Sequence, residues 1–461
     1  MTLQEYLKSL SGKKITVIGA GVSNRPLIAL LCDAGHSVTV CDKASPEALG
    51  AFYTEYAAKG VNFSLGESYL DHLDADIIFR TPGLYPGVPA LVKAREAGTL
   101  VTSEMEVFCR LCPCRIYAIT GSDGKTTTTT LISELLKTTG KTVWLGGNIG
   151  HPLLAEVDSM KADDYAVLEL SSFQLHSMMC SPAVAVITNI SPNHLDVHPD
   201  YQDYIDAKKQ VFKNQAEGAR LVLNLNNDVT AKCAAETNSD VRWFSRLQKV
   251  EKGAYLRDDG MICLTDGSKD IPVLPAEEIR IPGNHNIENM MTAFAAVEGV
   301  VSVEAMARTA REFKGVEHRL ETVRVLHGVT YINDSIASSP NRTIAGLSCF
   351  KDKVILIAGG KDKGIPLDAL GDAVCEHVKR LYLTGWTAEK IRDVVLACDK
   401  YEPGKPEVHV IDDFADTVRA AAAAAQDGDI VILSPACTSF DRFKNFMERG
   451  NTFRRIVEEL E

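Results

Sequence analysis

The segment Ala118-Ile119-Thr120-Gly121-Ser122-Asp123-Gly124-Lys125-Thr126-Thr127 determines the fold that we expect for the middle of this chain. The apolar run over 115–120 predicts a buried strand, the glycines predict a turn, and a helix is expected from Lys125 to about Thr139. Backbone N–H groups in such a turn, with a helix N-terminus behind them, bind phosphate oxygens. The candidate nucleotide ligands are Gly121, Ser122, Asp123, Gly124, Lys125, Thr126 and Thr127.

The loop is a shortened variant of the general phosphate-binding loop. The general pattern has a glycine six positions before its lysine, whereas this chain has Ile119 there and its first glycine at Gly121. Lys125 would place a positive charge beside the outer phosphates, and the Thr126 hydroxyl is suited to Mg²⁺. The order of strand, loop, Lys-Thr and helix favours an ATP site over a turn that only begins a helix.

The composition excludes several classes of protein. A chain of 461 residues is expected to form two to four domains, and 45% hydrophobic with 24% charged residues is typical of a soluble globular enzyme. The formal net charge of −12 argues against a nucleic-acid partner or a membrane surface. No apolar run is long enough to span a membrane, so we expect no membrane partner.

The twelve cysteines have no disulfide-framework spacing, and the first residues lack a signal-peptide pattern. We therefore expect free thiols and a cytoplasmic location. Cys109, Cys112 and Cys114 form a C-x2-C-x-C cluster, but a zinc site would need a second pair of ligands nearby, and the sequence offers none. Thiols in the core or on the surface are the expected state.

Three blocks of alternating strands and helices predict the α/β class with three domains. We expect an N-terminal Rossmann-like domain over 1–111, a central P-loop-type domain with a parallel sheet over 112–314, and a C-terminal Rossmann-like domain over 315–461. The apolar runs that predict strands lie at 14–18, 37–41, 76–79, 166–170, 183–189, 220–224, 329–332, 353–357 and 429–433.

A second glycine turn, Gly19-Ala20-Gly21-Val22-Ser23-Asn24, follows the first predicted strand. It is an incomplete dinucleotide fingerprint, because Asn24 stands where the pattern has its third glycine. Asp42 ends the second strand, where an acidic residue contacts a ribose or a base. We favour a UDP-type ligand over NAD at this turn, and a purely structural strand–helix turn is the alternative.

Chemistry-bearing residues follow the central strands. Glu169 ends one apolar strand, where the acids of nucleotide sites hold Mg²⁺, and His194 follows the next strand. Lys208 lies in a predicted amphipathic helix over 201–215. Taken singly, a loop histidine or a helix lysine is more often structural. Together, these positions after consecutive strands of one sheet favour a metal–phosphate centre.

As a set, these residues resemble the Mur ligase family, the ATP-dependent amide ligases of peptidoglycan precursor synthesis. The resemblance covers essentially the full length. It is carried by the motifs TGSDGKTTTT (120–129), GGNIG (146–150), LELSSFQL (168–175), NISPNHLD (189–196), YIDAK (204–208), GNHNIEN (283–289), EHRLE (317–321), YINDS (331–335) and SPACTSFDRFKNFMERG (434–450). LELSSFQL and the last motif point to the member that adds D-glutamate to UDP-N-acetylmuramoyl-L-alanine through an acyl phosphate, forming ADP and phosphate.

The resemblance implies how the domains share the work. The first would bind the UDP substrate, the second ATP and the third the amino acid, in a monomer whose third domain moves to exclude water. ATP and two Mg²⁺ ions are the implied cofactors, and the implied catalytic residues are Lys125, Glu169, His194 and Lys208. Thr126, Glu169 and His194 would hold the metal ions, together with Lys208 if that lysine is carbamoylated.

The remaining contacts are implied by matching motif positions. The residues that match ATP contacts are Asn289 for adenine, Arg319 for phosphate and Asp334 for ribose. The residues that match substrate contacts are Ser23 and Asp42 for the UDP group, Asn148 and Ser172 for the muramoyl-alanine arm, and Ser338, Lys363, Ser439 and Phe446 for D-glutamate.

One departure from the family lies in the third domain. The family often has Asp-Ser-Lys-Ala-Thr-Asn where this chain has DSIASS (334–339), so Ile336 removes a lysine charge, and Lys361 is the candidate replacement. Two other functions remain open from the sequence: a P-loop ATPase that moves a partner, and a sibling amide ligase of the folylpolyglutamate synthase kind. The first-domain glycine turn and the C-terminal motif disfavour the second.

Overall fold

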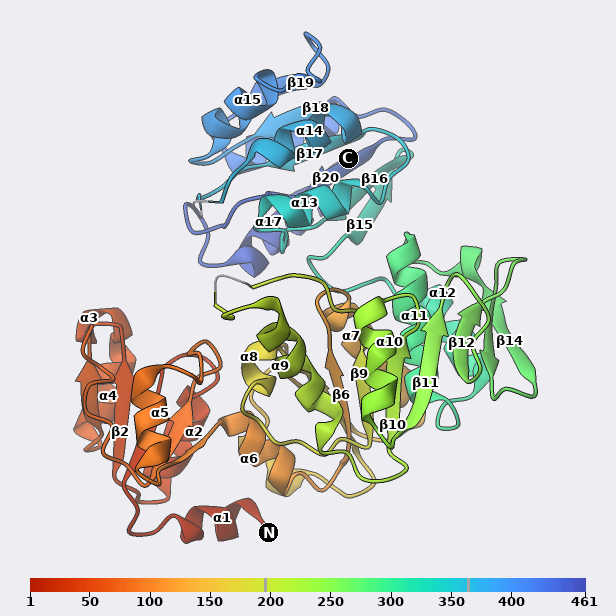
Figure 1. The fold of residues 1–461 in the computed structure, drawn as a ribbon. Helices are drawn as coiled ribbons and strands as arrows, with labels where there is room; N and C mark the ends of the chain where they lie inside the picture. Colours follow the sequence, from red (N-terminus) through yellow and green to blue (C-terminus); the bar gives the residue numbers. More distant parts are fainter. Residues whose placement is uncertain (195–196, 363–364) are drawn as a thin grey trace. The chain divides into compact units, whose positions relative to one another are not determined.

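The structure, a computed structural model, describes residues 1–194, 197–362 and 365–461. It contains three sheets rich in parallel strands, with helices between the strands, so the predicted α/β class is confirmed (Figure 1). The chain forms two compact units. Met1–Ile279 with Asn284–Arg311 make the first, which holds two sheets, and Arg280–Gly283 with Glu312–Glu461 make the second, which holds the third sheet.

The first sheet has five parallel strands in the order β3-β2-β1-β4-β5, the doubly wound arrangement expected of a Rossmann-like domain. Its strands are β1 (Ile15–Ile18), β2 (Val38–Asp42), β3 (Asn62–Leu65), β4 (Ile77–Arg80) and β5 (Leu100–Thr102). The helices of this block are α1 (Leu3–Ser9), α2 (Arg25–Asp33), α3 (Pro46–Leu49), α4 (Ala51–Ala58), α5 (Pro89–Glu96) and α6 (Glu104–Leu111). Asn24, which replaces the fingerprint glycine, is buried and donates from Nδ2 to the carbonyls of Ile18 and Gly19 at 2.9 and 3.0 Å. The Asn24 side chain thus stabilises the turn through hydrogen bonds that a glycine could not form.

The second sheet has nine strands in the order β14-β13-β12-β11-β10-β9-β6-β8-β7. They are β6 (Arg115–Thr120), β7 (Val143–Gly147), β8 (Tyr165–Glu169), β9 (Val184–Ile187), β10 (Arg220–Asn224), β11 (Asp240–Ser245), β12 (Gly253–Leu256), β13 (Met261–Thr265) and β14 (Asp270–Pro275). Only the pairs β12–β13 and β13–β14 are antiparallel. The chain passes from one side of β6 to the other between β8 and β9, and ligands of open α/β sheets bind beside such a switch point.

The helices of this second block are α7 (Lys125–Lys137), α8 (Ser172–Leu175), α9 (Tyr201–Lys213), α10 (Asp228–Cys233), α11 (Asn284–Val297) and α12 (Val303–Glu312), with short 3₁₀ turns at Leu154–Ser159, Ala234–Glu236 and Ala276–Glu278. Helix α7 begins with a lysine and five threonines, which are weak helix formers. Thr127, Thr128 and Thr129 are buried, and α7 packs against α11, so tertiary contacts compensate for the low propensity.

The third sheet has the order β15-β16-β20-β17-β18-β19. Its strands are β15 (Glu321–Leu326), β16 (Val329–Asn333), β17 (Val354–Ala358), β18 (Val378–Leu383), β19 (Glu407–Val410) and β20 (Ile430–Leu433). All neighbours are parallel except β15 and β16. The helices are α13 (Pro340–Leu347), α14 (Asp368–His377), α15 (Ala388–Leu396), α16 (Phe414–Ala423) and α17 (Phe446–Glu458). In the part of the chain that the structure describes, we find no helix with the length and apolar content needed to cross a membrane.

A buried carboxyl lies where the first block joins the second. Glu104, the first residue of α6, is 5% exposed, and its Oε1 accepts a 3.0 Å hydrogen bond from the backbone N–H of Leu154. Burial raises the pKa of Glu104 to about 7, although the Leu154 N–H lowers it in part. Between the ordinary pKa of a glutamate and pH 7, Glu104 therefore keeps its proton in the folded chain but loses it in the unfolded chain.

Because the folded state holds the extra proton, stability falls as the pH rises through this window, by up to about 3 kcal/mol. We expect Glu104→Gln to match the parent near pH 5 and to exceed it in free energy of unfolding at pH 8, since the amide oxygen still accepts from Leu154. Urea denaturation at the two pH values measures this. Exposed Glu96→Gln is the control, and it should change the free energy of unfolding by the same amount at both pH values. An equal shift for Glu104→Gln would contradict the prediction.

Candidate functional site: a phosphate-binding centre

The loop after β6 has the geometry of a phosphate site. Gly121 and Gly124 have φ angles of 147° and 76°, and α7 begins directly at Lys125. A Cβ on Gly121 would collide with the Thr188 hydroxyl, and one on Gly124 with the Asn289 amide oxygen. Both positions therefore require glycine. The first N–H groups of α7 have no partners within the helix, so this end of the helix can bind an anion.

The loop is held in place by the residues that follow β9. Ser122 N–H donates to the Asn189 carbonyl at 2.8 Å, and Asp123 N–H donates to Asn189 Oδ1 at 3.0 Å. The Thr188 hydroxyl donates to the Asp123 carbonyl at 2.6 Å. Neither Thr188 nor Asn189 was predicted to contact this loop. Both residues follow a strand that lies next to the P-loop strand, and this position could have predicted the contact.

Glu169, at the carboxyl end of β8, has the properties of a metal ligand. It is 1% exposed, and its Oε1 accepts from Asn148 Nδ2 at 2.8 Å. Among the residues that the structure describes, none forms a hydrogen bond with its buried Oε2. Leaving a charged oxygen buried and unpaired is costly unless a cation lies beside it. The Glu169 carboxylate therefore fits Mg²⁺, and the hydrogen bond from Asn148 orients it.

Lys208 lies beneath the same loop. It is 2% exposed, its Nζ donates to the Gly121 carbonyl at 2.7 Å, and Nζ is 4.6 Å from the centre of the Tyr204 ring. Burial, followed by the nearby charge of Lys125, holds the pKa of Lys208 well below its usual range. Lys125 itself donates to the Ser122 carbonyl at 2.9 Å. The structure thus brings Lys125 and Lys208 to one loop from two helices.

Tyr204, like Thr188 and Asn189, was not predicted to contact this loop. Its hydroxyl lies 3.0 Å from Ser122 Oγ, which also donates to the Ser191 carbonyl at 3.0 Å. His194 follows β9 as an exposed residue with a φ of 55°, and its ring lies 6.4 Å from that of Tyr204. Helix α9 therefore contributes two side chains, Tyr204 and Lys208, to the loop on which phosphate would bind.

Two more of the predicted ligands of the first unit, Asp42 and Ser172, form hydrogen bonds within it. Asp42 accepts from the backbone N–H groups of Ala20 and Ala44 at 2.6 and 2.8 Å, so it closes the turn after β1. Ser23 is exposed on that turn. Ser172 is buried beside His198 Nε2 at 3.0 Å.

Asn289, predicted to contact adenine, is buried on α11. Its Oδ1 accepts from Thr128 Oγ1 at 3.2 Å, and its Nδ2 donates to Asn286 Oδ1 at 3.1 Å. The residue therefore fixes α11 against α7 behind the loop.

In the second unit, the predicted residues gather at the carboxyl ends of β16 and β20. Asp334 is buried, and its oxygens accept from Ser434 Oγ at 2.8 Å and from the Leu320 N–H at 3.2 Å. Burial raises the pKa of Asp334 to about 7. Phe446 begins α17, and its carbonyl accepts from Ser335 Oγ at 2.8 Å. The other predicted residues of this unit are Arg319, half-buried Ser338 and buried Ser439, whereas Lys363 lies outside the described residues.

Arg449, which the sequence analysis did not single out, holds these ends together. It is 2% exposed, and its guanidinium donates to Ser335 Oγ, to the Ser335 carbonyl and to the Cys437 carbonyl at 2.9 to 3.2 Å. Lys361, the candidate replacement for the charge lost at Ile336, pairs through its backbone with Thr438, and its Nζ is 5.6 Å from the Trp386 ring.

Comparisons with known proteins identify the family of this chain. Residues 119–297 match the model of the Mur ligase middle domain, and residues 318–437 match that of the Mur ligase glutamate ligase domain. The chain is 51% identical to UDP-N-acetylmuramoylalanine--D-glutamate ligase of Acetivibrio thermocellus, with 100% of this chain and 99% of that protein covered. It is 48% identical to the protein of the same name from Clostridium novyi, over 100% of this chain and 99% of that one.

A solved structure supports the fold as well. UDP-N-acetylmuramate-alanine ligase of Thermotoga maritima superposes with a TM-score of 0.57 at 19% identity, covering 97% of this chain and 98% of that chain. The sequence relatives span the whole length of the chain, and the two family models cover most of it. The chain therefore belongs to the Mur ligase family.

Proposed function

We propose that this chain is an ATP-dependent ligase that joins D-glutamate to UDP-N-acetylmuramoyl-L-alanine, a step of peptidoglycan precursor synthesis. The observation that carries the proposal is the unpaired, buried Oε2 of Glu169 beside a P-loop with Lys125. The choice of substrates is supported by full-length relatives near 50% identity that bear this activity in their names.

The proposed chemistry begins with activation of a carboxylate, which is a poor acylating agent at neutral pH. The L-alanyl carboxylate attacks the γ-phosphorus of ATP, the bond to the bridging oxygen breaks, and ADP leaves. The α7 N-terminus and Lys125 stabilise the phosphate charge, and Mg²⁺ held by Glu169 and Thr126 would neutralise the β- and γ-phosphates. The deprotonated D-glutamate amine then attacks the acyl carbon, and phosphate leaves. A nearby carboxylate or His194 is the candidate base.

Lys208 is the second part of the proposal. Its lowered pKa favours the neutral amine, the form that adds to CO₂ to give a carbamate and a proton. A carbamate would replace a buried cation by an anion able to support a second Mg²⁺, together with His194. The surroundings of Lys208 fit this modification, because burial and the nearby positive charge of Lys125 both disfavour an ammonium there.

We propose that the enzyme works in the cytoplasm, because none of its twelve cysteines forms a disulfide. We further propose that it acts as a monomer. We also propose that 1–111, 112–314 and 315–461 act as UDP-substrate, ATP and amino-acid domains. In this proposal Ser23 and Asp42 serve the UDP group, Asn148 and Ser172 serve the muramoyl-alanine arm, and Ser338, Lys363, Ser439 and Phe446 serve D-glutamate.

ADP formation should require both substrates. We expect rapid ADP formation with UDP-N-acetylmuramoyl-L-alanine plus D-glutamate. ADP formation should be slow when D-glutamate is replaced by L-glutamate or meso-diaminopimelate, or is left out. A coupled ADP assay over this panel measures it. Hydrolysis that is independent of the amino acid would instead support a P-loop ATPase, and a preference for a folate acceptor would support the sibling ligase.

Glu169→Gln should lower kcat by at least about 100-fold, because the amide removes the charge that holds the metal. The fold should persist, since the amide oxygen still accepts from Asn148. The measurements are steady-state kinetics across Mg²⁺ concentrations and circular dichroism. Exposed Glu217→Gln is the matched control and should retain the parent rate. A Glu169→Gln rate within a few-fold of the parent would exclude Glu169 as the metal ligand.

Lys208 should carry a carbamate under CO₂. We expect a carbamate signal in the ¹³C NMR spectrum of enzyme equilibrated with ¹³C-bicarbonate, and its loss in Lys208→Met. Lys209→Met is the control, because that neighbour is paired with Glu236 at 2.6 Å and should keep the signal. A signal that survives in Lys208→Met, or none in the parent, would contradict the modification.

A further inference from the structure

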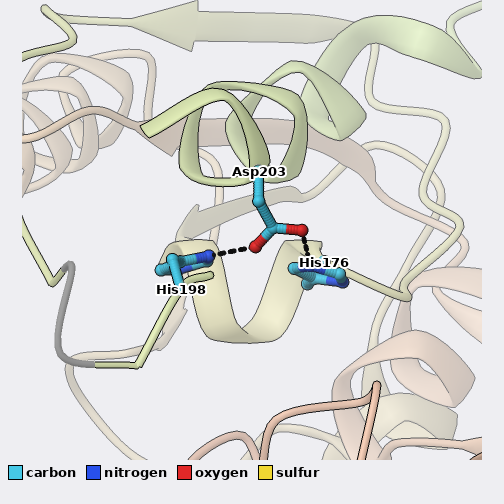
Figure 2. A group of neighbouring side chains, drawn as sticks. All are labelled: His176, His198 and Asp203. Carbon is cyan, nitrogen blue, oxygen red and sulfur yellow. Dashed lines mark hydrogen bonds and ion pairs between the residues drawn. The ribbon is translucent and has the colours of Figure 1, made fainter. Parts of the chain in front are cut away.

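A second group of metal-ligand side chains lies in the central domain, apart from the residues assigned to phosphate chemistry. His176 caps the C-terminus of α8, His198 precedes α9, and Asp203 lies in the first turn of α9 (Figure 2). Asp203 Oδ1 is 2.8 Å from His176 Nε2, and Asp203 Oδ2 is 2.6 Å from His198 Nδ1. The side chains converge on one point from three segments.

Local structure fixes these segments before any ion binds. Ser171 and Gln174 form a capping box at the start of α8, which ends at His176. Asp200 caps α9 and accepts from the Asp203 N–H at 2.8 Å. The two caps therefore order the helices that position His176 and Asp203, and little ordering remains there for an ion to supply.

The spacing of the ligand atoms suits a small ion. One nitrogen from each histidine and one carboxylate oxygen all lie within 4.8 Å of one another. Tetrahedral zinc, with bonds near 2.0 to 2.1 Å, needs ligand atoms about 3.3 Å apart. Rotation of the partly exposed His176 and Asp203 side chains would close the difference, because the three groups already face one another (Figure 2).

The surroundings also match those of a metal site. The His198 side chain is fully buried, whereas those of His176 and Asp203 are 20% and 24% exposed, which leaves a path for an ion. Phe173 stacks on His198 at 5.3 Å, and the Tyr85 ring meets His176 edge-on at 5.1 Å. These apolar walls limit the access of water to the site.

The outer ring nitrogen of His198 has the partner that a metal-bound histidine needs. Such histidines donate their other N–H to an oxygen, which fixes the tautomer. His198 Nε2 lies 3.0 Å from Ser172 Oγ. With Nδ1 bound to an ion, the neutral ring would carry its proton on Nε2 and donate it to Ser172 Oγ. The Tyr85 hydroxyl, 3.3 Å from Asp203 Oδ1, steadies the carboxylate from the other side.

We propose that His176 Nε2, His198 Nδ1 and Asp203 bind one zinc-class transition-metal ion, with water as the fourth ligand. Two imidazoles and one carboxylate favour Zn²⁺ or Co²⁺, whereas the oxygen-rich surroundings of Glu169 favour Mg²⁺. The two sites therefore differ in the class of ion that they take. The ion would cross-link α8 to α9, the helix that carries Lys208.

Cobalt is the probe for the test, because four-coordinate Co²⁺ absorbs visible light far more strongly than the six-coordinate ion. The full-length chain, freed of metal by a chelator, is titrated with Co²⁺. We expect strong visible bands that saturate at one ion per chain and disappear when Zn²⁺ is added. The absence of such bands would overturn the proposal.

Variants assign the bands to this site. Asp203→Asn and His176→Ala should weaken Co²⁺ binding at least about 10-fold. His151→Ala is the matched control, because His151 pairs with Glu156 elsewhere and should leave the titration unchanged. Glu169→Gln should also leave it unchanged. Loss of the bands in Glu169→Gln, or their survival in both site variants, would overturn the proposal.

Circular dichroism separates loss of the site from loss of the fold. Because His176 is partly exposed, His176→Ala should keep the parent spectrum. If Asp203→Asn unfolds, His176→Ala alone decides the outcome. Its full retention of the cobalt bands would then refute the site.

Discussion

The contact between the 121–124 loop and the exit of β9 is the constraint on which the centre of this protein depends. Thr188 and Asn189 hold the loop from one side, and Lys208 holds the Gly121 carbonyl from another. The space left is too small for any side chain at Gly121 or Gly124. The helix N-terminus behind the loop is then fixed in a position where phosphate charge can be stabilised.

A second constraint is that several ionic side chains are buried away from water. Glu169 keeps one oxygen unpaired, and Lys208 is buried with a lowered pKa. In the other unit, buried Arg449 ties two strand exits together by donating to carbonyl and hydroxyl oxygens. Stability alone does not favour such groups, because each loses hydration on folding. Glu169 ends a strand, whereas Lys208 and Arg449 reach strand exits from helices α9 and α17. Charges fixed in this way suit a catalytic centre.

Much of the fold was predictable because local rules and tertiary structure agree. The strand over 115–120 has the predicted bounds, and the predicted helix that begins at Lys125 ends at Lys137. The four strands β11–β14 were not predicted, since their residues alternate only weakly between apolar and polar and Pro272 interrupts one of them. Their pairing depends on contacts with β10 and on one another, which a local pattern does not encode.

The sequence by itself determined the α/β class, the phosphate loop and the family resemblance, because short-range chemistry carries each of them. Only the tertiary structure decided which oxygen of Glu169 remains unpaired, that Lys208 contacts Gly121, and that Tyr204, Asn189 and Arg449 support the sites. It also brought His176, His198 and Asp203 together. The physical reason is that burial and hydrogen-bond partners depend on residues distant in sequence, whose distances are set when strands and helices pack.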